Sequence, residues 1–199
     1  MALADERGIE AVTMRELGRE LGVEAASLYN HVAGKDELLD GMVELAIAEI
    51  ELPDGGVGWK EAMRRRAHSA REVFARHGWV AALHDSRDRA GPNSLSYVDS
   101  VLGVLIDAGF SPAAAANAFL VVDGYIYGFE RRRSSFGTGA DANGTEAAQE
   151  VVAAIPVGAY PNALRVAAEF ARTPFDQDAA FDFGLGLILD GLERLLPGA

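Results

Sequence analysis

Several residue types and patterns are absent from this chain of 199 residues. It has no cysteine, which excludes disulfides, thiolate metal ligands and a cysteine nucleophile. No apolar run approaches the roughly 18 residues that a membrane span needs, and the opening MALADERGIE lacks the basic-then-apolar pattern of a signal peptide. We therefore expect a cytoplasmic protein.

Positive charge is also scarce, with 18 Lys and Arg against 30 Asp and Glu, a net charge of −12. Such a chain is not expected to wrap nucleic acid over much of its surface, so any contact with nucleic acid would be confined to a small patch. Apolar residues make up 49% of the sequence and charged residues 24%, which is typical of a folded globular protein.

The spacing of apolar residues has the helical period along most of the chain, and the alternation typical of strands is hard to find, so the predicted fold class is all-α. The stretch around Pro53 and DGGVG divides the chain into an expected N-terminal domain, residues 1–47, and a larger helical bundle, residues 48–199. Between residues 134 and 149 the sequence predicts a loop. Predicted helices of the larger bundle are 59–76, 93–108, 112–131, 161–172 and 176–196.

Two short helices joined by a glycine turn are predicted near the N-terminus. Thr13 and Glu16 form a capping-box pattern before the first helix, whose apolar face is Met14, Leu17, Gly18 and Leu21. Gly22 is placed to end this helix, and Val23 is expected to be buried in the turn. The second helix is predicted over 25–32, and a third opens near Asp36. This pattern fits a helix-turn-helix, although spacing alone leaves an ordinary helical hairpin as an equal alternative.

The wider pattern TMRELGREL-GVE-AASLYNHVAGKDELL, residues 13–39, resembles the DNA-binding domain of the tetracycline repressor (TetR) family. More faintly, Gly58-Trp59, Gly109-Phe110-Ser111 and FDFGLGLILDGLERLL resemble its tetracycline-repressor subgroup. The resemblance implies a homodimer that binds double-stranded operator DNA and a small-molecule inducer. Family members have a full helix before the segment matching GIEAVT, whereas only LADER precedes it here, so a truncated first helix is expected and the native N-terminus could lie upstream of Met1.

By the same resemblance, Arg15 matches an operator-contacting position and Lys35 a phosphate-binding lysine. The recognition-helix positions are Ala25, Ala26, Ser27, Tyr29 and His31. Two alanines leave little direct base readout except contact with thymine methyl groups, so the operator is expected to differ from that of the tetracycline repressors. Residues 1–35 hold four basic and six acidic side chains. We therefore expect weak non-specific binding, and operator binding that depends on salt and on a dimer spanning half-sites about 34 Å apart.

Candidate ligand-binding residues in the larger domain are Arg66, His84, Phe119, Asp123 and Tyr125. His84 matches the histidine that holds the magnesium-drug chelate in tetracycline repressors, but Arg66 stands where their drug-binding asparagine lies, so tetracycline is not the expected ligand. His68, His77 and His84 do not share one helical face, and we predict no metal and no cofactor. Arg66 is expected to turn inward, toward an acidic ligand or Asp123. The aromatic residues near Asp123 could equally be core.

The last predicted helix is apolar nearly all round, which indicates burial on several sides. The resemblance implies that this helix and residues 112–131 form a four-helix bundle with a second subunit, with Gly184, Gly186 and Gly191 allowing close approach. The expected function is a ligand-responsive DNA-binding regulator, most simply a repressor, and not an enzyme. The alternative is a helical-bundle carrier or enzyme, but the sequence offers no Cys, no HExxH pattern and no convincing acid pair.

Overall fold

The computed structural model describes residues 1–53, 55–84, 91–135, 153–156, 158–173 and 176–197, and for residues 82, 84 and 132–135 the backbone alone. Within these ranges every regular element is a helix, so the all-α prediction is confirmed. None of the described helices is both long and apolar enough to cross a lipid bilayer.

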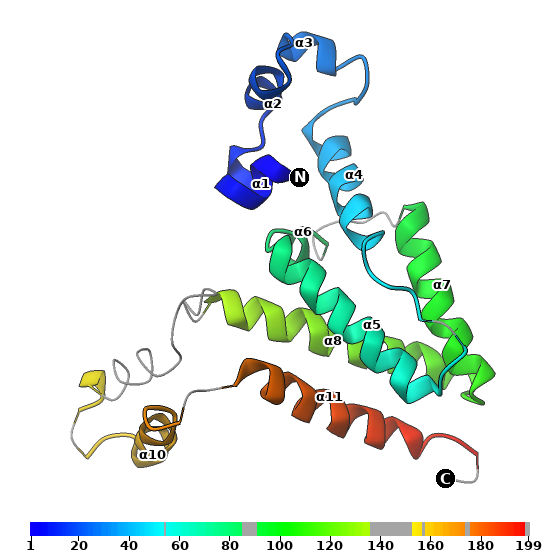
Figure 1. The fold of residues 1–199 in the computed structure, drawn as a ribbon, viewed down its shortest axis with the longest axis vertical. Helices are drawn as coiled ribbons and strands as arrows, with labels where there is room; N and C mark the ends of the chain where they lie inside the picture. Colours follow the sequence, from blue (N-terminus) through cyan, green and yellow to red (C-terminus); the bar gives the residue numbers. More distant parts are fainter. Residues whose placement is uncertain (54, 85–90, 136–152, 157, 174–175, 198–199) are drawn as a thin grey trace.

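The helices form two groups along the chain (Figure 1). The first group comprises α1 (Ala2–Arg7), a short 3-10 turn (Ile9–Ala11), α2 (Met14–Leu21), α3 (Ala25–Leu28) and α4 (Lys35–Ile47). The second comprises α5 (Trp59–Arg76), α6 (Val80–His84), α7 (Pro92–Asp107), α8 (Pro112–Ser135), α10 (Pro161–Phe170) and α11 (Gln177–Glu193). In Figure 1, α2 and α3 lie at one end of the long axis, and α4 leads from them to the second group.

Most predicted helices are present, with shifted ends. The helix predicted over 59–76 is α5, with both ends as expected. The one predicted over 25–32 is wrong in its second half, because α3 ends at Leu28 and residues 29–31 form turns. The prediction of a loop from residue 134 is wrong for its first two residues, which belong to α8, and residues 136–149 lie outside the described part. Five-residue α6 was missed, because so short a helix shows no period.

The turn between α2 and α3 is built by backbone contact. Thr13 Oγ1 accepts a hydrogen bond from the Glu16 amide at 3.2 Å, and Gly22 ends α2 with a left-handed φ of 69°, both as predicted. A Cβ on Gly18 would lie 2.8 Å from the carbonyl oxygen of Val23, so the turn backbone packs directly on α2. The Val23 side chain is consequently 45% exposed, and the prediction that it is buried was wrong.

The core of the second group lies where α8 contacts α5, α7 and α11. Phe181 and Leu185 of α11 and Ile126 of α8 are among its fully buried side chains. Arg71 of α5 forms ion pairs with Glu130 of α8 (2.9 Å) and Asp178 of α11 (2.7 Å). This arginine is therefore balanced by acids, and it ties three helices together.

One carboxylate joins the two groups of helices. Glu44 of α4 accepts hydrogen bonds from the backbone amides of Gly91 (3.2 Å), Asn93 (2.7 Å) and Ser94, and from the Ser94 hydroxyl. These amides open α7 and have no partner within that helix, so Glu44 caps α7 from a different element. The cap also requires glycine at position 91, because a Cβ there would overlap the Glu44 side chain.

A second link runs from α1 to the end of α5. Asp5 Oδ1 lies 2.7 Å from both His77 Nδ1 and Trp79 Nε1, and Glu49 Oε2 lies 3.3 Å from His77 Nε2. His77 and Trp79 are both buried. The N-terminal helix is thus held against the second group of helices by a hydrogen-bonded cluster.

We predict that Gly18→Ala destabilises the protein and Gly41→Ala does not. The added methyl at position 18 would collide with the turn backbone, whereas position 41 faces open space in a helix, where alanine is favoured by up to about 1 kcal/mol. Chemical denaturation of both variants measures the difference. A Gly18→Ala protein as stable as the wild type would show that α2 does not pack on the turn as described.

We also predict that Glu44→Ala lowers the free energy of unfolding by about 1 kcal/mol, as removal of a helix cap does elsewhere. Hydrogen exchange should accelerate at the amides of Gly91, Asn93 and Ser94, which no longer have an acceptor. Glu44→Gln should have a smaller effect because its amide oxygen still accepts. Asp99→Ala, at an exposed position on α7, is the control, and equal effects at positions 44 and 99 would contradict the prediction.

Candidate functional site

The seven residues predicted to contact DNA lie from the start of α2, through α3, to the start of α4 (Figure 1). Exposed among them are Arg15, Ala26, Tyr29, His31 and Lys35. Ala25 and Ser27 are partly covered, and the Ser27 hydroxyl donates to the Glu24 carbonyl oxygen at 2.7 Å. The helix-turn-helix therefore presents small and polar side chains along one accessible stretch.

Some basic residues of this segment form ion pairs with acidic side chains and others do not. Arg7 and Arg19 both bind Glu16, which lies 2.6 Å from Arg7. The hydrogen bond from Arg7, aided by Arg19, lowers the pKa of Glu16 below its ordinary value, so this carboxylate stays ionised. Within residues 1–53, all of which are described, Arg15 and Lys35 have no acidic side chain as a partner. Their charge remains available to an anion.

A buried polar cluster lies in the second group of helices. Arg66 of α5 has no exposed surface, and its Nη2 lies 2.5 Å from Oδ1 of Asp123 on α8. The Tyr97 hydroxyl, from α7, donates to the same oxygen at 3.3 Å, and the Tyr97 ring centroid lies 5.2 Å from the guanidinium carbon of Arg66. Arg66 therefore turns inward to Asp123, one of the two orientations that the sequence left open.

Sequence reasoning missed Tyr97. A tyrosine on the inward face of a helix rich in valine and leucine is typical of core, and only the position of Arg66 and Asp123 in space shows that its hydroxyl has a polar partner. Burial raises the pKa of Tyr97, so its hydroxyl remains a neutral donor to Asp123.

Of the other predicted ligand-binding residues, one lies beside this cluster and one points away from it. Phe119 lies one turn before Asp123 on α8, with its ring centroid 6.3 Å from that of Tyr97. Tyr125 points elsewhere, since its hydroxyl donates to the Phe181 carbonyl oxygen at 2.9 Å. His84 ends α6, and its side chain lies outside the described part. The structure thus brings Arg66, Asp123 and Phe119 together and separates Tyr125 from them.

The two other histidines of the larger domain have acidic partners. His68 Nε2 lies 2.8 Å from Asp182 Oδ1, and His77 belongs to the cluster that joins α1 to α5. Among the described side chains, no group of three histidines and carboxylates is arranged to hold a metal ion.

Large apolar side chains on α8 and α11 remain exposed. Phe181, Leu185 and Leu189 of α11 are buried within the chain, whereas Phe183 is 70% and Leu187 60% exposed. On α8, Leu120 and Val121 are also exposed. Gly184 allows a close approach within the chain, because the Tyr125 side chain lies where its Cβ would be. Gly186 and Gly191 face open space.

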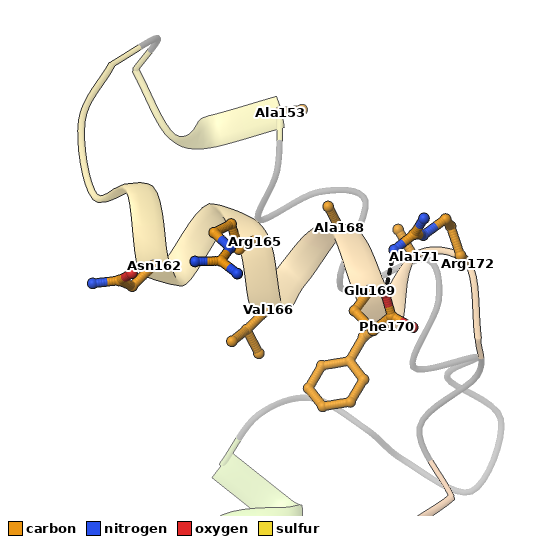
Figure 2. A pocket seen from close by; sticks show the side chains of 9 residues that line it. All are labelled: Ala153, Asn162, Arg165, Val166, Ala168, Glu169, Phe170, Ala171 and Arg172. Carbon is orange, nitrogen blue, oxygen red and sulfur yellow. Dashed lines mark hydrogen bonds and ion pairs between the residues drawn. The ribbon is translucent and has the colours of Figure 1, made fainter.

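An open pocket lies along α10 (Figure 2). Its lining comes from α10 and the residues directly after it, together with Ala153, and Arg172 binds Glu169 there. None of its described lining residues comes from α5, α7 or α8. This pocket is therefore separate from the Arg66 cluster.

Two family models match the chain. Residues 1–42 match the bacterial regulatory proteins of the tetR family, and residues 52–196 match the tetracyclin repressor-like C-terminal domain. The HTH-type transcriptional repressor DrrR1 of Streptomyces coeruleorubidus is 31% identical over 203 residues, which cover 98% of this chain and 74% of that protein. The class A tetracycline repressor from transposon 1721 of Escherichia coli is 29% identical, covering 96% and 86% of the two chains.

Solved structures agree. The Streptomyces coelicolor protein ActR in complex with actinorhodin superposes with a TM-score of 0.80 at 28% identity, covering 97% of this chain and 92% of that one. A possible TetR family regulator from Streptomyces coelicolor A3(2) gives the same TM-score at 30% identity, covering 98% and 95%. With residues 1–42 and 52–196 matched by family models and the fold shared with these structures, this protein belongs to the TetR family of transcriptional regulators.

Proposed function

We propose that this regulator acts in the cytoplasm as a homodimeric repressor that binds operator DNA and is released by a small-molecule ligand. Residues 1–47 would form the DNA-binding domain, and residues 48–199 the domain for ligand binding and dimerisation. We assign the protein no catalytic role.

The observation that carries the DNA-binding proposal is the distribution of charge on the helix-turn-helix. Within residues 1–53, Arg15 and Lys35 lack acidic partners and flank the exposed side chains of α3, whereas Arg7 and Arg19 are bound by Glu16. Backbone phosphates are the anions that such placed cations bind. A chain with a net charge of −12 would thus hold DNA through a few local contacts.

The side chains of α3 indicate how sequence would be read. Tyr29 and His31 are exposed hydrogen-bonding groups suited to phosphates, and Ser27 could reach a phosphate or a base once it releases Glu24. Ala25 and Ala26 offer only methyl groups, which match the thymine C5-methyl in the major groove. This short helix therefore favours thymine contacts and readout of DNA shape over bidentate recognition.

The exposed apolar surface on α8 and α11 supports dimerisation. A monomer would leave Leu120, Phe183 and Leu187 in water, and exposed apolar side chains on two neighbouring helices are typical of an interface. Packing α8 and α11 against the same pair in a second copy would cover them by two-fold symmetry. Such a dimer would present two helix-turn-helix units about one DNA turn, or roughly 34 Å, apart.

The buried cluster of Arg66, Asp123 and Phe119, extended by Tyr97, is the proposed ligand site. The tetracycline repressors are named for a small molecule and ActR was crystallised with actinorhodin, which supports a small-molecule ligand for this relative. His84 and Tyr125 stay predictions as ligand contacts.

A continuous path of contacts supports coupling of the two sites. Tyr97 lies one helical turn from Ser94, and Ser94 binds Glu44 of α4. The same α4 begins at Lys35, beside the proposed DNA surface. A ligand that shifts α7 would move α4, and preference of the ligand for that shifted conformation would weaken binding to the operator.

Gel-shift titration with DNA from upstream of the protein's own gene tests the proposal. We predict specific binding by the wild type. In Arg15→Ala the slope of the salt dependence should fall by about one for each half-site, because each loses one bond to a phosphate. Arg19→Ala, which removes an arginine already bound by Glu16, is the matched control with a smaller effect. Absence of specific binding by the full-length protein would refute the function, and equal effects at positions 15 and 19 would refute the assigned surface.

Dimerisation is tested by Leu187→Glu on α11. A carboxylate placed in the apolar interface would have to lose its hydration, so we expect the variant to be a monomer by sedimentation velocity and to lose operator binding at least tenfold. Leu95→Glu is the control, since Leu95 is equally exposed but lies on α7, outside this surface. A dimeric Leu187→Glu protein would exclude α11 from the interface.

A further inference from the structure

Arg66 has hydrogen-bonding capacity that the described part of the protein leaves unused. The side chain has no exposed surface, and Nη2 is bound to Asp123. Among the described residues, the Nε and Nη1 atoms have no hydrogen-bond acceptor. Since Nε carries one N–H and Nη1 carries two, three donors of a buried cation are unpaired there.

The surroundings of Arg66 explain why no described group meets these donors. On its own helix, Ala62, Met63 and Ala70 lie one turn away, are buried and have no side-chain oxygen. Ser69, also one turn away, has a hydroxyl, and this hydroxyl accepts a hydrogen bond from the Glu51 amide at 2.8 Å. Tyr97 presents its ring to the guanidinium and directs its hydroxyl to Asp123 Oδ1, the oxygen that Arg66 also binds. Burial raises the pKa of that hydroxyl, so it does not become an anionic partner.

An arginine that serves only to hold two helices together would be expected to have its donors satisfied. Arg71, on the same helix, shows this arrangement, with Glu130 on Nε and Asp178 on Nη1. Arg66 has the same side chain and is less exposed to water than Arg71, yet its Nε and Nη1 atoms have no acceptor among the described residues. Buried donors without a partner are rare in native proteins and typical of sites that receive a further group.

We infer that Arg66 is the recognition group for an anionic oxygen of the ligand, and that the ligand class is an organic acid bearing a carboxylate. The inference rests on the proposed function, because it takes the Arg66 cluster as the ligand site. The planar guanidinium holds its N–H groups at fixed angles, which match the oxygens of a carboxylate better than a single neutral carbonyl.

Asp123 holds the Arg66 side chain in position for the ligand. It already neutralises part of the Arg66 charge, so the cation is held in place before the ligand arrives and the ligand does not have to order a flexible side chain. The chain as a whole is strongly acidic and would repel an organic acid at long range. Selectivity for an acid must therefore come from local donors, and Arg66 supplies three.

The experiment uses the full-length protein, a DNA duplex that it selects from random sequence, and a panel of aromatic and aliphatic carboxylic acids, each paired with its primary amide. Calorimetry measures binding to the protein, and fluorescence anisotropy measures release of the duplex. We expect at least one acid to bind about ten times more tightly than its amide and to release the DNA. A site that hydrogen-bonds a ligand oxygen rejects an analogue lacking it by at least this factor.

Three variants test whether the preference for an acid over its amide depends on Arg66. Arg66→Met with Asp123→Asn removes both buried charges at similar volume and should bind acid and amide equally. Arg66→Lys keeps the charge but loses the planar donors, so its preference for the acid should fall, and it carries the test if the double variant does not fold. Arg65→Met is the matched control, because Arg65 is exposed and bound to Glu61, and it should keep the wild-type preference.

The outcomes separate the two proposals. Failure of the wild type to select any DNA sequence would refute the proposed function. Selection of DNA with no acid bound, or with acids no better than their amides, would overturn the assignment of Arg66 and leave the DNA-binding function standing. Preference for the acid that survives in both Arg66 variants would also overturn it.

Discussion

The buried pair of Arg66 and Asp123 is the interaction around which the second group of helices is arranged. It joins α5 to α8 where α7 also meets them, through Tyr97. Removing one member of a buried pair leaves an uncompensated charge and costs about 3–5 kcal/mol, whereas apolar residues of similar volume would serve stability at least as well. The pair is therefore poorly explained by stability alone, and its incomplete hydrogen bonding is better explained by ligand recognition.

Glu44 connects the helix that carries Tyr97 to the N-terminal group of helices. Its carboxylate binds the first amides of α7, one turn before Tyr97, while its own helix begins at Lys35, beside the proposed DNA surface. The cap is compact because Gly91 has no side chain to separate the two helices. A change in the tilt of α7 therefore cannot leave α4 in place unless the cap breaks, which gives the two domains a direct mechanical connection in addition to the covalent linker.

The sequence predicts those features that depend on local pattern. The Thr13 cap, the Gly22 end of α2 and the length of α5 follow from residues within a few positions of one another. Features that depend on distant residues were missed or wrong. Val23 is exposed because Gly18 lets the turn backbone take its place, and Glu16 completes no capping box because Arg7, nine residues away, binds it. Tyr97 and Glu44 owe their roles to partners on other helices.

Acidic residues restrict the cations both at the proposed DNA surface and at the proposed ligand site. In the N-terminal group of helices, Glu16 binds two of the three arginines, so few cations remain for DNA and each must be well placed. Non-specific attraction, which grows with the number of phosphate contacts, is thereby kept low while specific contacts are retained. In the interior, one acid holds one arginine without satisfying it. In both places a carboxylate limits what a cation can bind, so that the remaining contacts depend on geometry and confer specificity.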